Sequence, residues 1–187
     1  MRTVDVRAAK ERAQELVFGR WSSADWAFNF DGLLVSAQAA NRQRQAYTQL
    51  FRSGAVELFS AGHEFSTQHG PRAVGGLYVT DDVRNAIRVG LQAARSVGAA
   101  GGTLVSASVS GVDGLLFSLG TITDLTASYR ADRDQLALNE QWIENTGEVN
   151  LDTVARPILD VLWQSFGLES CLCYNDVGQF DPQARFR

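Results

Sequence analysis

The sequence is poor in residues that crosslink a chain or anchor it in a membrane. It has two cysteines and three prolines among 187 residues, and Lys10 is its only lysine. Cys171 and Cys173 are too few for a disulfide scaffold, and next neighbours along a strand point to opposite faces, so we expect both to be buried thiols. No apolar run reaches the roughly eighteen residues of a membrane span, and the N-terminus carries charges where a signal peptide needs an apolar stretch. These absences predict a cytoplasmic protein that contacts no membrane.

The common catalytic signatures are also missing. No serine lies in a G-x-S-x-G pattern, and the chain has no G-K-[ST] phosphate loop. The glycine-rich Gly98–Gly102 segment follows a predicted helix and precedes a predicted strand, the reverse of the order that presents amides to a phosphate. The residues therefore favour a non-catalytic protein without a cofactor.

Composition and charge are those of a globular domain with an uneven charge distribution. The chain is 45% hydrophobic and 20% charged, with a net charge of −4. Residues 1–112 hold 12 basic and 9 acidic side chains, whereas residues 113–187 hold 5 and 12. We expect a single domain over residues 1–187, and the acidic balance argues against a dedicated nucleic-acid binder.

Three segments have the apolar spacing of amphipathic helices. They cover residues 4–18, the stretch after Asp81, and Thr153–Phe166. Gly98 and Gly167 end the second and third helices, because glycine adopts the conformation that terminates a helix without steric cost.

Turn residues between β-like runs predict three hairpins. Their turns are expected at Asp31-Gly32, at Ser53-Gly54 and over Gly111–Gly114. Residues 62–76 show no sustained period, so a surface loop is expected there, with a short strand over residues 76–80.

The second hairpin is specified in most detail. A two-residue turn at Ser53-Gly54 pairs Phe51 with Val56 on the face that meets the core. The same register makes Arg52 and Glu57 diagonal neighbours on the opposite face, where their charges can pair.

One more strand is expected at Gln141–Ile143. Hairpin strands combined with single helices favour an α+β domain, in which an antiparallel sheet built from hairpins is covered by about three helices. The core of this domain is expected within residues 26–180.

The two histidines lie six residues apart and suggest a metal site. The candidate ligands are His63, Glu64 and His69. A zinc-protease helix needs its histidines four residues apart, and a catalytic zinc needs a third protein ligand, so this spacing alone meets neither condition. Loop geometry can still bring the three together, which would give a metal-dependent hydrolase. Two solvated loop histidines are the simpler interpretation.

Three arginines form a stripe on the helix after Asp81. Arg84, Arg88 and Arg95 project within about 40° of one another at 3.6 residues per turn. A row of guanidinium groups can follow a phosphate backbone, although such contacts do not read bases, so nucleic-acid binding through it would be weak. The same side chains can instead cover the core edge or pair with the acidic last third of the chain.

Motifs spread over about residues 26–180 carry a family resemblance. They are Phe30-Asp31-Gly32, the segment Tyr47–Glu57, the turn Gly111–Gly114, the segment Arg156–Trp163 with Gly167, and Tyr174-Asn-Asp176. In these motifs the chain resembles the C-terminal region of bacterial Schlafen-type, AlbA-like DNA-binding proteins, which are often labelled ATP-binding or helix-turn-helix proteins. The family's N-terminal AlbA-like domain is not present in this sequence. The resemblance implies a non-catalytic accessory or interaction domain that acts with an AlbA-like partner domain or subunit.

Overall fold

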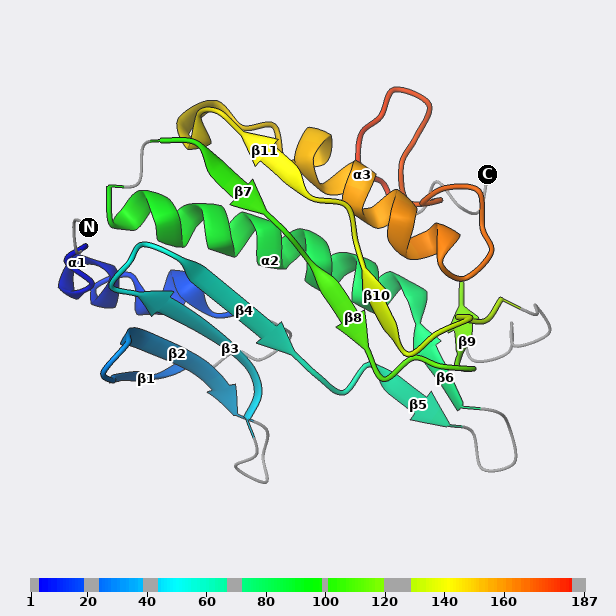
Figure 1. Cartoon of the computed structure of the whole chain (residues 1–187), viewed down its shortest axis with the longest axis horizontal. Coiled ribbons are helices and arrows are strands. Elements are labelled where there is room, and N and C mark those ends of the chain that lie inside the picture. Colours follow the sequence, from blue (N-terminus) through cyan, green and yellow to red (C-terminus); the bar gives the residue numbers. More distant parts are fainter. Residues whose placement is uncertain are drawn as a thin grey trace. The chain divides into compact units, whose positions relative to one another are not determined.

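A computed structural model describes residues 4–18, 24–38, 44–66, 72–98, 101–119 and 129–182 (Figure 1). The chain forms two compact units, each assembled from segments that are separate in the sequence. Unit 1 comprises residues 1–62, 84–103 and 144–148, and unit 2 comprises residues 63–83, 104–143 and 149–187. Strands are mostly antiparallel and helices are few, so the predicted α+β class is confirmed. The single-domain boundaries stay a prediction.

Unit 1 contains a four-stranded antiparallel sheet in the order β1-β2-β3-β4. Its strands are β1 (Ala24–Phe28), β2 (Gly32–Gln38), β3 (Arg44–Phe51) and β4 (Val56–Ser60). Strands that are neighbours in the sequence are neighbours in the sheet. This order places β1 and β4 at the two edges.

The N-terminal segment covers one face of this sheet as two short helical pieces. They are α1 (Arg7–Lys10) and the 3₁₀ helix η1 (Ala13–Leu16). The continuous helix predicted over residues 4–18 is wrong, because the Arg12 backbone, with φ −111° and ψ 19°, leaves the α-helical region. Val6, Ala9, Ala13 and Leu16 of this segment are nevertheless buried. They pack with residues of β2, β3 and the second half of the long helix: Leu33, Val35, Leu50 and Ala93.

The loop between β3 and β4 is longer than predicted. The Phe51 amide donates to the Ala55 carbonyl, and the Gly54 amide donates to the Phe51 carbonyl, both at 2.9 Å. These bonds enclose a three-residue loop, Arg52-Ser53-Gly54. Gly54 has φ 91°, the left-handed conformation that closes such loops. Leu50 therefore pairs with Val56, and the predicted Phe51–Val56 pairing is wrong. Because a shift of one residue exchanges the faces of a strand, Leu50 enters the core instead.

Unit 2 contains three small sheets. β5 (Glu64–Ser66), β6 (Arg72–Gly75) and β9 (Leu116–Ser118) form one, β7 (Thr103–Val105) pairs with β11 (Gln141–Ile143), and β8 (Ser108–Ser110) pairs with β10 (Gln135–Ala137). All of these residues except Thr103 belong to unit 2. The predicted strand at Gln141–Ile143 is confirmed.

Two sequence-based expectations for this region are wrong. The surface loop expected over residues 62–76 contains β5 and β6. The hairpin expected around Gly111–Gly114 does not form, because β8 pairs with β10 and β9 runs parallel to β6. All three residues of β9 are buried. This is typical of a strand that is covered on both faces and not of a strand in an exposed hairpin.

The long helix α2 (Gly76–Ser96) starts five residues before Asp81, after which the helix was predicted, so the strand expected over residues 76–80 is wrong. Glycine permits this direct passage from strand to helix, because a Cβ atom at Gly76 would lie 2.6 Å from the ring of Phe117. Residues 76–83 of α2 belong to unit 2 and residues 84–96 to unit 1.

The third predicted helix is confirmed as α3 (Leu151–Gln164), which lies in unit 2. Asn150 caps it by accepting a 2.9 Å hydrogen bond from the Asp152 amide. Trp163 is fully buried, packs its ring edge-on against Phe117 at 5.2 Å, and donates from Nε1 to the Thr80 hydroxyl at 2.9 Å. None of the helices in the described segments is long and apolar enough to cross a membrane.

Candidate functional site

The structure describes two of the three residues of the expected metal site, His63 and Glu64. His63 and Glu64 are adjacent in an extended segment, so their side chains point to opposite sides. His63 Nε2 lies 3.2 Å from a carboxylate oxygen of Asp82 on α2, and both side chains are largely buried. His69 lies outside the described residues. Within the described segments, no three His, Cys, Asp or Glu side chains are placed to hold a metal ion together.

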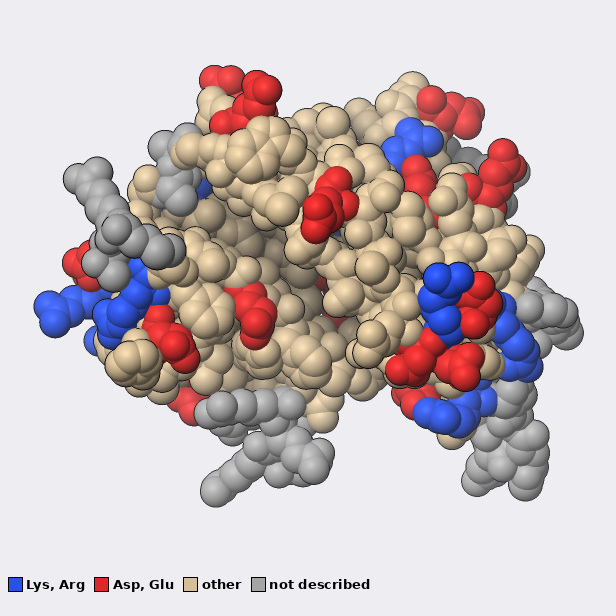
Figure 2. All heavy atoms as spheres, viewed as in Figure 1, with Lys and Arg blue, Asp and Glu red and all other residues tan. Residues whose placement is uncertain are grey.

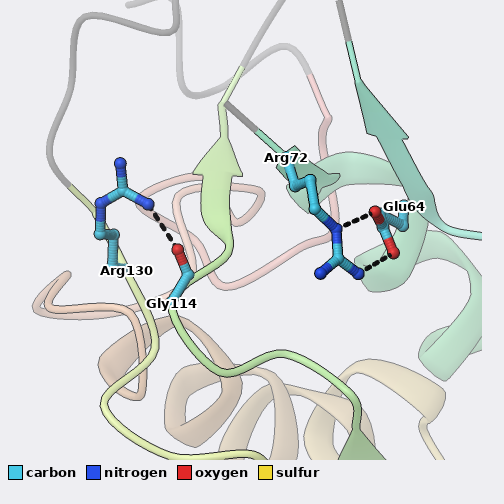
Figure 3. Close-up of polar contacts among 4 residues, drawn as sticks. All are labelled: Glu64, Arg72, Gly114 and Arg130. Carbon is cyan, nitrogen blue, oxygen red and sulfur yellow. Dashed lines mark hydrogen bonds and ion pairs between the residues drawn. The ribbon is translucent and has the colours of Figure 1, made fainter. Parts of the chain in front are cut away.

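The carboxylate of Glu64 accepts hydrogen bonds from the exposed guanidinium of Arg72 on the neighbouring strand (Figure 3). The two residues are diagonal neighbours across the β5-β6 pair. This hydrogen-bonded pair lowers the pKa of Glu64 and raises the pKa of Arg72. Glu64 and Arg72 therefore form a structural ion pair on the surface of unit 2.

The cysteines are buried free thiols, as expected. The amide of Cys171 donates to a carboxylate oxygen of Asp160 on α3 at 2.8 Å. A hydrogen bond between the side chains of Cys171 and Cys173, together with burial, raises the pKa of Cys171. The thiol therefore stays protonated, which makes it a poor nucleophile.

The arginine stripe lies on the unit 1 part of α2, and its side chains are largely engaged. Arg88 donates to Asn85 at 2.7 Å and to Gln92 at 3.3 Å. Arg95 Nε donates to the carbonyl of Thr146 at 2.6 Å, and Arg84 is half-buried. These hydrogen bonds join Arg88 and Arg95 to neutral groups and not to carboxylates. A nucleic-acid role for the stripe stays a prediction.

The least expected feature of unit 1 is the edge strand β1, whose aromatic side chains remain accessible. Trp26 is 42% exposed, Phe28 is 44% exposed, and Phe30 at the tip of the β1-β2 turn is 96% exposed. Trp26 and Phe28 form an edge-to-face pair with ring centroids 5.9 Å apart, and the ammonium of Lys10 lies 4.4 Å from the centroid of the Trp26 ring. We call Trp26, Phe28 and Phe30 the aromatic edge.

The pairing of β1 with β2 determines which backbone N–H and C=O groups of β1 point to the open edge of the sheet. The amide of Asn29 donates to the Gly32 carbonyl at 3.0 Å, which makes this a hydrogen-bonded pair. Hydrogen-bonded and non-hydrogen-bonded pairs alternate along an antiparallel ladder, so Trp26 and Phe28 occupy non-hydrogen-bonded positions. Their N–H and C=O groups therefore point away from β2. Within the described residues, β1 pairs with no strand on that side.

A hollow lies at the end of the sheet where the aromatic edge finishes. Its volume is about 460 Å³, and it is open to solvent. It is lined by the turn after β1 and by the end of β3 with the turn that follows: Phe30, Asp31, Phe51, Arg52 and Ser53. Arg52 Nε donates to the Phe30 carbonyl at 3.1 Å, which joins the two turns.

Near the opposite edge of the sheet, the expected pairing of Arg52 with Glu57 is wrong. Glu57 instead accepts a 2.6 Å hydrogen bond from the hydroxyl of Tyr47. The Tyr47 ring stacks on Phe59 with centroids 5.4 Å apart. The register between β3 and β4 explains the change, because it pairs Glu57 with Gln49. Tyr47 lies two residues from Gln49 on the same face of β3, so Glu57 and Tyr47 are diagonal neighbours.

Sequence reasoning missed the aromatic edge, although a signal exists. Aromatic residues stand at every second position in Trp26-Ala-Phe28-Asn-Phe30. Such alternation ordinarily indicates a strand with its apolar face in the core, and the place of β1 at the sheet edge decides otherwise. No family model, no curated protein and no solved structure matches this chain.

Proposed function

We propose that this chain is a non-catalytic protein-interaction domain that receives an extended segment of its partner alongside β1. The observation that supports this function is the aromatic edge, which combines exposed aromatic side chains with outward-facing backbone groups. In an isolated protein, such an edge is usually blunted by charges, proline or a covering element. Asp25 is the only charged residue within β1.

An added strand would use both sets of groups. The N–H and C=O groups of Trp26 and Phe28 supply main-chain hydrogen bonds, which give affinity in strand addition. Their half-exposed rings supply apolar area beside the incoming side chains, and aromatic residues dominate the binding energy of many interfaces. The hollow beyond Phe30 offers space for a side chain at the end of the segment.

The local charges favour a protein partner over a nucleic acid. Lys10 lies over the Trp26 ring, and Arg52 is bonded to the Phe30 carbonyl. The carboxylates of Asp25 and Asp31 lie in the same strand and turn. A phosphate backbone would meet these two carboxylates, whereas a neutral extended peptide is not repelled.

The resemblance to Schlafen-type, AlbA-like proteins suggests the partner. We propose that the segment belongs to an AlbA-like domain or subunit, carried in the same polypeptide or in a separate one. The best probe is therefore a purified AlbA-like domain of a Schlafen-type protein.

Calorimetric titration of that domain into the full chain tests the proposal. Trp26→Ala removes the ring, whereas Trp26→Pro also removes the outward N–H group, which β1 does not use in its pairing with β2. We expect Trp26→Ala to weaken binding about tenfold and Trp26→Pro to weaken it further.

Phe59→Ala is the matched control, because Phe59 is similarly exposed but lies on the other edge strand, β4. It should leave affinity unchanged, and thermal melts should show that all variants fold. Binding of Trp26→Pro at the wild-type affinity would refute the proposed edge.

A further inference from the structure

A second exposed tryptophan lies in unit 2, on the β7-β11 pair. Trp142 is the middle residue of β11 and is 65% exposed, and Leu104 is the middle residue of β7 and is 55% exposed. Their neighbours in the two strands are less exposed, because side chains alternate between the faces of a strand. Trp142 and Leu104 therefore both face outward on adjacent strands.

Small and polar side chains surround this outward face. The ribbon continues into β8 and β10, where the amide of Leu138 donates to the Ala107 carbonyl at 3.0 Å. The exposed positions along it include the small residues Ser106, Ser108 and Ala137 and the longer Gln135 and Asn139. Trp142 is itself 65% exposed, so its indole can be reached by an extended chain that lies along this part of the ribbon.

The charge of this surface is acidic and unbalanced. Glu140, two residues before Trp142, is exposed, and its carboxylate has no hydrogen bond or ion pair with any described residue. The described arginines of unit 2 are held elsewhere. Arg72 bonds to Glu64 and Arg130 to the Gly114 carbonyl (Figure 3). Arg133 bonds to Asp132, and Arg156 lies near Asp160. Figure 2 shows basic and acidic side chains intermingled around β5, and acidic side chains beside β11. Unit 2 as a whole has 6 basic and 13 acidic residues.

We propose that the outward face of β7-β11 binds an arginine-bearing extended segment of a partner protein. A planar guanidinium stacks on the face of an exposed indole, for which cation–π attraction is strongest among aromatic residues. The carboxylate of Glu140 accepts its hydrogen bonds, and Leu104 contacts the methylene stem. Because the surface is acidic, it repels nucleic acid and selects a basic peptide. This surface is independent of the aromatic edge in unit 1.

Fluorescence anisotropy with a labelled octapeptide of alternating arginine and threonine tests the proposal on the full chain. We expect saturable binding that weakens with salt. The corresponding lysine peptide should bind several-fold more weakly, because an ammonium does not stack flat on an indole and lacks the planar pair of N–H donors that binds both oxygens of a carboxylate. A glutamate peptide should not bind.

Variants locate the site on the ribbon. Trp142→Ala should weaken binding of the arginine peptide about tenfold, and Glu140→Gln about threefold. Glu169→Gln and Val177→Ala remove a similarly exposed carboxylate and an exposed apolar side chain elsewhere in unit 2, and both should bind as the wild type does. No binding by the wild type, wild-type binding by Trp142→Ala, or equal losses in Glu140→Gln and Glu169→Gln would each overturn the proposal.

Discussion

Single residues in the quoted motifs shape the backbone more than they supply chemistry. A Cβ atom at Gly32 would lie 2.0 Å from the Leu50 carbonyl oxygen, so only glycine permits the close approach of β2 and β3 there. The side chain of Asn175 accepts hydrogen bonds from the amides of Val177 and Gln179 and thereby folds the loop after α3. Trp163 fills the core of unit 2. These motif residues are explained by the fold itself.

Tyr47 gives a prediction that titration can test. Its hydrogen bond to Glu57 raises its pKa above the usual 10.0. The folded protein therefore keeps this proton at a pH where the unfolded chain releases it, so the contribution of Tyr47 to stability falls as the pH rises above about 10. Glu57→Gln should lower the pKa of Tyr47 toward its usual value, as followed by ultraviolet titration of the four tyrosines. An unchanged titration curve would show that the bond does not form in solution.

At the scale of elements, local signals predicted the structure where the partner segment is close in sequence. The dipeptides Asp31-Gly32 and Ser53-Gly54 marked the hairpins β1-β2 and β3-β4, although the loops themselves are Phe30-Asp31 and Arg52-Ser53-Gly54. The apolar period located α3. The parallel pairing of β6 with β9 joins segments separated by all of α2, and no local residue pattern encodes such a partner. The start of α2 was missed for a related reason, because two glycines resemble a break until Phe117 is seen packed against Gly76.

For the candidate sites too, features set by nearby residues could be predicted, and features set by distant residues could not. The helical spacing of Arg84 and Arg88 was deducible from the sequence, whereas their hydrogen-bond partners were not. Trp26 and Trp142 look like core residues in a sequence, and only their places on an edge strand and on a two-stranded ribbon show that they are accessible. Exposure is a tertiary property, so sequence alone could not identify either surface.

The register of the β3-β4 hairpin gives a prediction at this scale. Leu50 is buried in the core of unit 1, whereas Phe51 is half-buried beside the open hollow. Leu50→Ala should lower the free energy of unfolding by about 2–5 kcal/mol by leaving a cavity, and Phe51→Ala by clearly less. Urea titrations of both variants measure the difference. A larger loss for Phe51→Ala would support the register with a two-residue turn.

At the scale of the whole molecule, charge and accessible aromatic residues are distributed unevenly. Unit 1 carries 11 basic and 8 acidic residues, against 6 and 13 in unit 2. The aromatic edge of unit 1 presents backbone groups to a neutral strand, whereas the β7-β11 face of unit 2 presents an indole and a carboxylate to a cation. The two proposed surfaces therefore differ in chemistry, and each calls for a different kind of segment.

The same distribution argues that nucleic acid is a weak ligand. Three stripe arginines neutralise at most about three phosphates, so log affinity for duplex should fall with log salt at a slope of about −2.7. Arg88 and Arg95 would also have to leave their neutral partners, Asn85 and the Thr146 carbonyl, before contacting phosphate. We therefore expect no complex tighter than about 10 µM near physiological salt in anisotropy titrations of labelled oligonucleotides. A sub-micromolar complex that the double substitution Arg84→Glu with Arg88→Glu abolishes would instead identify the stripe as a nucleic-acid-binding face.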